Sequence, residues 1–398
     1  RAPGRVEPTP GGDTVAPSTP TVSPTPSSPP GAETSRSGER GAERSGHELV
    51  WEPGPPLPEP RSNNAVVSVR VGEDWRLYSM LGLGSGRTAA DIARDAWVMP
   101  RGGSWRPSEA VPGGEGRLAA TAQATDGKVY LFGGYTVARG GAEGSGPQVE
   151  VYDPISRGWW KAAPMPRRVD DAVSVTWQDT IVLVSGWHQR DNVRDVQRFD
   201  PATNRWSALP PIVGTPVFGH AGAMVRDSLV YCDGVGVDRS RDQPFFAVQE
   251  CHAMALADAD SRWTALPHHG RATRYRAAAG ALPERGWVVF AGGTGRPYNY
   301  DGTGYDGLPA QARGEVFAWD VGAQRWIELP SLPTPSMDHR GLVRVDDALW
   351  SIGGMHDGGE VHGEVWVLRE RGTTSSHGGG VTGSSERPRE TGAVGSKP

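Results

Sequence analysis

One pattern of four short strands recurs six times along the chain, and it constrains the fold more than any other feature of the sequence. Each unit has an apolar strand after a charged turn, a second strand that ends at a glycine pair or its remnant, a third strand, and a fourth strand carrying tryptophan. The second strands read LYSMLG, VYLFGG, IVLVSG, LVYCDG, WVVFAGG and LWSIGG. A repeated all-β unit of this kind predicts one ring or array rather than two ordinary domains.

Tryptophans mark the fourth strands at intervals of 46 to 63 residues. They are Trp51, Trp105, Trp160, Trp206, Trp263 and Trp326. The hairpins VEVYDPISRGWW, VQRFDPATNRW and VFAWDVGAQRW join the third strands to the fourth through short turns. In these features the sequence resembles the kelch repeat, which implies an all-β, six-bladed kelch β-propeller. We expect the tryptophan rings to pack between blades rather than to stack on a ligand.

The two ends of the repeat region predict how the ring closes. The last repeat stops at GEVWVLRE without a tryptophan-bearing fourth strand, whereas HELVWEP, at the start of the repeats, has the character of one. We therefore expect the N-terminal strand to complete the sixth blade, which removes exposed sheet edges. The kelch resemblance covers about Glu48 to Glu370.

Two flanking segments differ in composition from the repeats. Residues 1–46 contain APSTPTVSPTPSSPP and almost no bulky apolar side chain, and residues 372–398 are rich in glycine, serine and threonine. Such segments bury too little surface to offset the entropy of ordering. We expect a disordered Pro/Ser/Thr-rich leader or linker over 1–46, the propeller over 47–371, and a disordered tail over 372–398.

Charge and hydropathy narrow the choice of partners. The formal charge is −5 without a basic stripe, so we expect no nucleic-acid partner. No stretch has the roughly 18 to 20 apolar residues of a transmembrane segment. We expect a monomer that uses no cofactor and binds a glycan or protein on one propeller face.

The two cysteines bear on the cellular compartment. Cys232 and Cys251 fall in strands predicted to be neighbours and antiparallel, where opposed side chains come within disulfide range. Two interpretations stay open: a disulfide, or two free buried thiols. A disulfide would indicate an oxidising compartment, and the chain opens at Arg1 rather than at a methionine. We expect a protein that is secreted, periplasmic or tethered to a cell surface.

The first set of candidate site residues precedes the innermost strands. In a four-stranded blade, the loop before the first strand and the loop between the second and third strands emerge on the same face. This geometry gathers polar side chains near one mouth of the central channel, where they could contact a ligand or pair with one another and with water. The set comprises Asn63, Asn64, Arg117, Asp170, Asp171, His220, Arg274, Arg276, Asp338, His339 and Arg340.

The second set lies in the loops that follow the glycine pairs. The longest of these loops, Thr294 to Arg313, alternates tyrosines with acids and amides among glycines, a composition that suits a sugar or peptide ligand. The alternative is a loop that only packs over the next blade. The candidates are Tyr298, Asn299, Tyr300, Asp301 and Tyr305, with Trp187, His188 and His356 from companion loops. We expect no metal site, because His268 and His269 lack an acidic or cysteine partner at metal-ligand spacing.

A second resemblance suggests an activity. FAGGTGRPYNYDGTGYDG and LYSMLGLGSG look like the long fifth-blade loop and the first-blade signature of the six-bladed bacterial N-acetylneuraminate epimerases. The resemblance implies an extracytoplasmic sugar mutarotase with a proton-transfer glutamate after an Asn-Gly pair, where this chain has Asp233, Gly234 and Val235. Because valine transfers no proton, an epimerase would need Asp233, Asp238 or Asp338 instead. We therefore expect a binding module, with the mutarotase as the alternative and catalytic residues unassigned.

Overall fold

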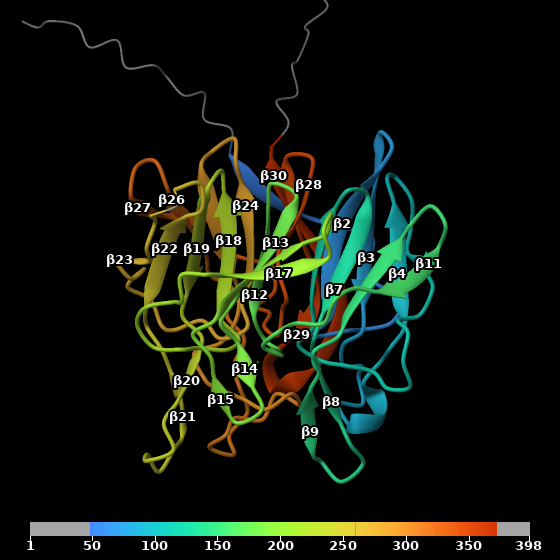
Figure 1. The fold of residues 1–398 in the computed structure, drawn as a ribbon. Coiled ribbons are helices and arrows are strands. Elements are labelled where there is room, and N and C mark those ends of the chain that lie inside the picture. Colours follow the sequence, from blue (N-terminus) through green and yellow to red (C-terminus); the bar gives the residue numbers. More distant parts are fainter. Residues whose placement is uncertain (1–47, 259, 372–398) are drawn as a thin grey trace, which may run out of the picture. The chain divides into compact units, whose positions relative to one another are not determined.

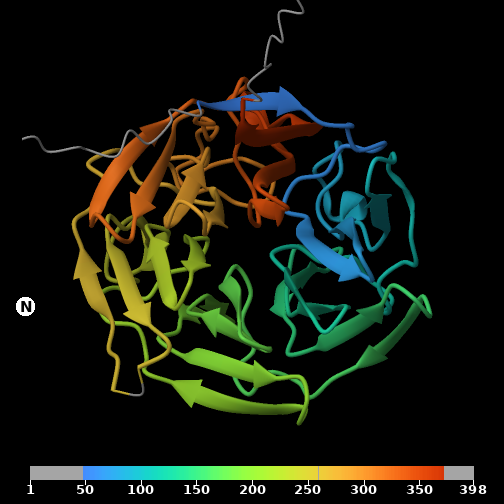
Figure 2. The same cartoon turned by 90° about the horizontal axis from the view of Figure 1, so that it is seen from above.

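The computed structural model describes residues 48–258 and 260–371, which form six four-stranded antiparallel sheets around a central axis (Figures 1 and 2). This arrangement confirms the predicted six-bladed propeller. Five blades follow one another along the chain. From the innermost strand outward, the first blade contains β2 (Ala65–Val71), β3 (Asp74–Met80), β4 (Ala96–Pro100) and β5 (Arg106–Pro107), and the second contains β6 (Thr121–Thr125), β7 (Lys128–Phe132), β10 (Val149–Asp153) and β11 (Gly158–Lys161). In the same order, the third blade contains β12 (Val173–Trp177), β13 (Thr180–Val184), β16 (Val196–Asp200) and β17 (Arg205–Leu209), and the fourth contains β18 (Ala221–Val225), β19 (Ser228–Cys232), β22 (Cys251–Ala255) and β23 (Thr264–Leu266). The fifth blade contains β24 (Ala278–Leu282), β25 (Trp287–Ala291), β26 (Val316–Asp320) and β27 (Arg325–Leu329).

The sixth blade joins strands from both ends of the repeat region. It contains β28 (Val343–Val345), β29 (Ala348–Met355), β30 (Val361–Glu370) and, outermost, β1 (Leu49–Pro53). Strand β1 runs antiparallel to β30, from Leu49 opposite Glu370 to Pro53 opposite Trp366. Because β1 precedes the first blade in the chain, this pairing links the first and last blades.

Three extra hairpins extend from the loops between the second and third strands of blades two, three and four. They are β8 (Tyr135–Val137) with β9 (Glu143–Ser145), β14 (Trp187–His188) with β15 (Asp191–Asn192), and β20 (Val235–Val237) with β21 (Phe245–Ala247). In Figure 1 they project together from the lower end of the propeller. We call this end the loop face. Two short 3-10 helices, η1 (Ala89–Asp91) and η2 (Asp357–Gly359), complete the described elements.

Tryptophan indoles tie each blade to the preceding one. The indole Nε1 of a fourth-strand tryptophan donates to a backbone carbonyl of the previous blade's outer segment in every blade. The pairs are Trp51 with Pro330, Trp105 with Pro55, Trp159 with Glu109, Trp206 with Ala163, Trp263 with Pro210 and Trp326 with Pro267. The packing role expected for these rings is therefore correct, with one error in register.

The error concerns the second blade, where the linking ring is Trp159 and not Trp160. Trp160 is 43% exposed, whereas Trp159 packs against Tyr152 with ring centroids 4.9 Å apart. Adjacent residues of a strand point to opposite faces, so an assignment that is wrong by one residue selects the outward ring.

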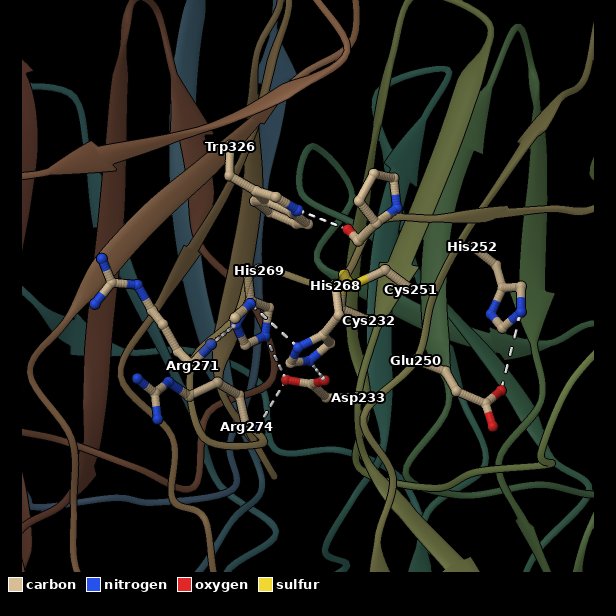
Figure 3. Close-up of a disulfide and its surroundings, with 12 residues drawn as sticks. Cys232, Asp233, Glu250, Cys251, His252, His268, His269, Arg271, Arg274 and Trp326 are labelled. Carbon is tan, nitrogen blue, oxygen red and sulfur yellow. Dashed lines mark hydrogen bonds and ion pairs between the residues drawn. A yellow bond between two sulfur atoms is a disulfide. The ribbon is translucent and has the colours of Figure 1, made fainter. Parts of the chain in front are cut away.

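The disulfide predicted as one of two alternatives is present. Cys232 ends β19 and Cys251 begins β22, directly opposite each other in the antiparallel register. Their sulfurs are bonded and both residues are buried (Figure 3). The link lies within the fourth blade and crosses the base of the β20–β21 hairpin.

The predicted leader and tail, 1–46 and 372–398, lie outside the described residues. Within the part that the structure describes, no helix has the length and apolar character needed to span a bilayer.

Candidate ligand-binding site

A belt of backbone hydrogen bonds surrounds the axis where each blade's innermost strand begins. One residue per blade has a left-handed backbone, with φ between 50° and 66°. These residues are Asn63, Ala119, Asp171, Gly219, Arg276 and Asp338. Most of them donate their N–H to the carbonyl of the preceding member, as Gly219 does to Asp171 at 2.9 Å. Two links differ: the Ala119 N–H is bound by the Asn63 Oδ1, and His339 rather than Asp338 donates to Arg276.

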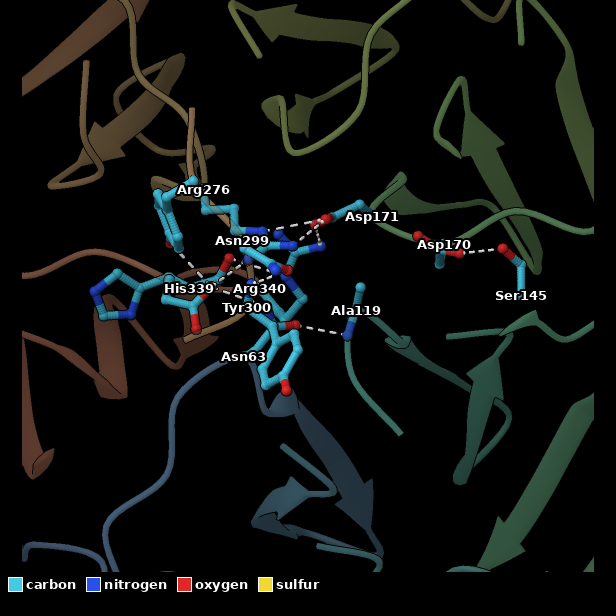
Figure 4. A network of polar contacts seen from close by, with 12 residues as sticks. Asn63, Ala119, Ser145, Asp170, Asp171, Arg276, Asn299, Tyr300, His339 and Arg340 are labelled. Atoms are coloured by element: carbon cyan, nitrogen blue, oxygen red, sulfur yellow. Dashed lines mark hydrogen bonds and ion pairs between the residues drawn. The ribbon is translucent and has the colours of Figure 1, made fainter. Parts of the chain in front are cut away.

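Side chains of the belt form a buried ion network (Figure 4). The Arg276 guanidinium donates from Nη2 to Asp171 Oδ2 at 2.7 Å and from Nη1 to Asp338 Oδ1 at 3.1 Å. Arg340 pairs with the other oxygen of Asp171. Asn63 Nδ2 and the Tyr298 hydroxyl also donate to Asp338 Oδ1, at 2.8 and 3.0 Å. Both arginines thus have anionic partners inside the protein.

Two adjacent carboxyls of this region titrate in opposite directions. Burial opposes ionisation of Asp171, but the Arg276 and Arg340 charges outweigh it and hold its pKa below the usual value. Burial, reinforced by the Asp171 charge, raises the pKa of Asp170 well above the usual value. Neighbouring acids with separated pKa values are a common feature of functional sites.

A pocket of about 270 Å³ opens on the loop face, against the network. Asp171 and Arg276 line it together with Asp170 and with aromatic rings from the projecting hairpins. The full lining is Tyr135, Glu143, Asp170, Asp171, Trp187, Gln189, Phe218, Phe245, Arg276, Asn299 and Tyr305. We call this cavity the loop-face pocket. Six of its members, Asp170, Asp171, Trp187, Arg276, Asn299 and Tyr305, were candidates from sequence.

Three further candidates lie instead along the central channel, a separate cavity of about 420 Å³ between the innermost strands. His220, His339 and Arg340 line it. The ion pair between Arg340 and Asp171 connects the channel lining to the pocket lining. The belt and its side chains therefore separate two cavities where the sequence predicted one polar ring.

The other polar candidates have partners within the protein. Arg117 is buried against Glu150 at 2.9 Å, and Arg274 lies 3.4 Å from Glu315. His188 Nδ1 is 2.8 Å from the Arg168 carbonyl, and His356 Nδ1 is 2.9 Å from that of Pro335.

Some residues of the long fifth-blade loop pack inside the protein, and others line the pocket. Tyr298 is fully buried in an apolar cluster, and Tyr300 packs against that cluster. The Asp301 carbonyl accepts from Arg87 at 3.1 Å. Asn299 and Tyr305 reach the pocket. Neither ligand contact nor simple packing describes the whole loop.

The expectation that His268 and His269 lack an acidic partner is wrong. Their Nε2 atoms each lie 2.8 Å from one oxygen of Asp233, a residue more than thirty positions earlier in the chain (Figure 3). Backbone N–H groups of Gly270 and Arg271 donate to the two Nδ1 atoms, at 3.3 and 3.2 Å.

These contacts assign the protons of the cluster. With both Nδ1 atoms accepting, both Nε2 atoms carry hydrogen and donate to the carboxylate, which also accepts from the Arg274 N–H. Metal binding through Nε2 would require a proton on Nδ1, facing a backbone donor. The arrangement of the two imidazole rings therefore fits a hydrogen-bonded link between the fourth blade and the segment that enters the fifth blade better than it fits a metal site.

Several residues of the pocket wall, most of them in the hairpins, were not predicted from the sequence. Tyr135 and Glu143 come from β8 and β9, Phe245 from β21, and Phe218 from the loop before β18. The rings of Phe218 and Phe245 both contact Trp187, at centroid distances of 5.4 and 5.9 Å. These aromatic residues lie in the same two classes of loop as the polar candidates, before the first strand or between the second and third strands of a blade. That position is the signal by which the sequence could have indicated them.

Comparison with known proteins places these observations in context. The Kelch motif family model matches residues 171–212, which include the third blade. Kelch-like protein 25 of Xenopus tropicalis is 29% identical over 157 residues, 38% of this chain and 25% of that protein. Kelch-like protein 35 of Mus musculus is 23% identical over 270 residues, 68% of this chain and 40% of that protein.

The chain thus spans a quarter to two fifths of the length of these curated relatives. Among solved structures, that of YjhT superimposes with a TM-score of 0.64 at 18% identity, covering 80% of this chain and 97% of YjhT. At this identity the likeness concerns the fold alone.

Proposed function

Since the chain is a six-bladed kelch β-propeller, a fold that commonly serves as a protein-binding module, we propose that it is an extracytoplasmic binding module whose loop-face pocket takes one residue of a glycan. The observation that carries this proposal is the pocket itself, in which aromatic rings and hydrogen-bonding side chains face one small cavity. Flat rings cover the apolar faces of a sugar while amides and carboxyls meet its hydroxyls.

The composition of the pocket favours a sugar over an extended apolar ligand. Asn299 and Gln189 supply amides, and Asp170 supplies a carboxyl, beside the rings of Trp187 and Tyr305. A volume of about 270 Å³ lies just below the usual range for drug-sized ligands, roughly 300 to 1,000 Å³. One hexose-sized unit suits that space.

The disulfide between Cys232 and Cys251 supports an oxidising, extracytoplasmic location. A Pro/Ser/Thr-rich leader over 1–46 would then act as a spacer that holds a monomeric propeller away from a surface.

A glycan array probed with the full chain tests the proposal. Tyr305→Ala removes a ring that is 37% exposed and stacks on Phe245, so it should abolish the array signal without unfolding the protein. Trp160→Ala is the matched control, because it removes an exposed ring of the outer strand β11, outside the pocket lining. Equal losses in both variants, or a signal that survives Tyr305→Ala, would rule out this pocket as the glycan site.

One observation favours a sugar mutarotase as a second candidate. The three aspartates suggested from the sequence as substitutes for the glutamate have other partners. Asp233 accepts hydrogen bonds from two histidines, and Asp338 accepts one from Arg276. Asp238 accepts one from the Ser240 hydroxyl within its own turn. Asp170 instead lines the pocket with a raised pKa, as a general acid requires. Faster exchange of N-acetylneuraminate anomers by NMR, lost in Asp170→Asn, would support this activity; exchange at the uncatalysed rate would exclude it.

A further inference from the structure

We propose that the ligand of the loop-face pocket carries a protonated amine, so that an amino sugar binds in preference to its N-acetylated or anionic counterparts. The inference rests on the glycan-binding function proposed above and specifies the class of sugar. It follows from the charges, the rings and the unpaired carboxyl oxygens of the pocket.

The charges lining the pocket are unbalanced. Glu143 comes from β9, Asp170 and Asp171 from the loop before β12, and Arg276 from the loop before β24. The other lining residues, from β8, β14 and the turn after it, the loop before β18, β21 and the fifth-blade loop, are uncharged. Arg276 is the one cation of this lining, and it is engaged by both Asp171 and Asp338. Little positive charge is left for an anionic ligand.

Two carboxyl groups of the pocket form no ion pair with a cation within the described part of the chain, and burial outweighs the Arg276 charge in setting the pKa of both. Glu143 forms no hydrogen bond or ion pair among residues 48–258 and 260–371, although it lines the pocket. Asp170 is 97% buried, and its Oδ2 accepts from Ser145 at 2.5 Å. Its Oδ1 has no donor among the same described residues, and Figure 4 shows one carboxyl oxygen turned away from Ser145.

Aromatic rings occupy the other walls. Trp187, Phe218 and Phe245 contact one another at centroid distances of 5.4 to 6.1 Å, and Tyr305 stacks on Phe245 at 4.1 Å. Tyr135 adds a further ring. Ring faces attract cations, and they do so more strongly where the cation is desolvated.

Together these features favour an ammonium group on a sugar ring. The rings can cover the sugar and the cation, while the Glu143 and Asp170 oxygens accept the ammonium hydrogens. An N-acetyl group has one N–H and no charge, and a ligand carboxylate would face unpaired carboxyls across the pocket. The same site should therefore prefer an amino sugar to its N-acetylated counterpart and to an anionic sugar.

The test compares two trimers with the same skeleton, the glucosamine trimer and the N-acetylglucosamine trimer, by calorimetry on the full chain at about pH 6.5, where sugar amines are largely protonated. N-acetylneuraminate is the anionic probe. We expect the glucosamine trimer to bind at least tenfold more tightly than either of the others. Because burial raises the pKa of Asp170, binding of the amine should also release a proton, detected as a heat that depends on the buffer.

Two matched variants locate the effect. Glu143→Gln keeps the size of the side chain but removes its charge, and it should reduce the preference for the amine at least fivefold while leaving the N-acetylated trimer unaffected. Asp191→Asn removes a charge from the neighbouring strand β15, outside the pocket lining, and should change neither affinity. Thermal unfolding checks that both variants are folded.

The outcomes separate the two proposals. If the N-acetylated trimer or N-acetylneuraminate binds as tightly as the amine, and Tyr305→Ala abolishes that binding, the amine preference is wrong and the glycan site stands. If no trimer or array glycan binds in a manner that depends on Tyr305, the glycan-binding function fails, and the amine inference fails with it. A loss of preference equal in Glu143→Gln and Asp191→Asn would also overturn the inference.

Discussion

Replacing Arg276 with methionine tests whether the belt network holds the propeller together. Arg276 is 3% exposed and donates to Asp171 through two nitrogens, at 2.7 and 3.1 Å, and to Asp338 at 3.1 Å. Methionine approximates the length of the side chain but provides no donor. The substitution would leave two carboxyls, both almost fully buried, without their shared cation.

The cost follows from this geometry. Breaking a buried ion pair by removing one partner typically costs about 3 to 5 kcal/mol, because the remaining charge stays buried. Arg340 still pairs with Asp171, and Asn63 and Tyr298 still donate to Asp338, so we expect a value within that range rather than above it. For a domain of about 320 residues, such a loss lowers the melting temperature by roughly 4 to 7 °C.

Calorimetric unfolding of three variants provides the measurement. Arg276→Met should unfold earlier by that interval, and adding Asp338→Asn should recover part of the loss, because Asp338, unlike Asp171, keeps no ion pair within the described residues once Arg276 is removed. Arg344→Met is the control: its pair with Glu284 is exposed at 3.2 Å and should contribute less than about 1 kcal/mol. The network does not stabilise the fold if Arg276→Met loses no more stability than Arg344→Met, or if the second substitution lowers the stability of Arg276→Met further.

Three further predictions concern pH, the disulfide and ring closure. Burial lowers the pKa of His220 to about 3, below its unfolded value near 6.5, so its contribution to stability is full above about pH 6.5 and is lost as pH falls toward 3; His220→Gln should flatten the pH dependence of the urea midpoint. Denatured, unreduced protein should show no titratable thiol, and replacing both Cys232 and Cys251 with serine should cost about 3 kcal/mol in denaturant unfolding. Deleting 1–46 should leave the melting temperature unchanged, whereas deleting 1–55 removes β1 and should lower it clearly; equal values would contradict the closing role of that strand.

The sequence predicted the fold well because repetition averages out local ambiguity. Six copies of one strand pattern define the blades even where a single glycine pair is degraded, as in LVYCDG. The position of an individual residue within one blade is not supported by repetition in this way. In RGWW the two adjacent tryptophans were equally good candidates, and the choice of Trp160 over Trp159 was wrong by one residue.

The candidate site was predicted less completely, for two physical reasons. Polar residues could be assigned to a face of the propeller, but their pairing depends on side chains far apart in sequence, such as Arg276 and Asp171, which are 105 positions apart. The aromatic wall was missed because Tyr135 and Phe245 lie in hairpin strands of three residues, too short for an alternating pattern to be recognised.

If the loop-face pocket binds a ligand as proposed, the belt and the hairpins have different roles. The belt positions recur in all six blades with the same left-handed backbone, and Arg276 forms buried ion pairs with Asp171 and Asp338, so changing these residues should affect stability before recognition. The loop-face pocket instead draws on three hairpins and one long loop, which differ from blade to blade. The three hairpins belong to blades two, three and four, so the pocket does not follow the sixfold repeat of the described blades. On that proposal, exchanging hairpin residues such as Glu143 or Phe245 should change the ligand preference while the belt keeps the ring intact.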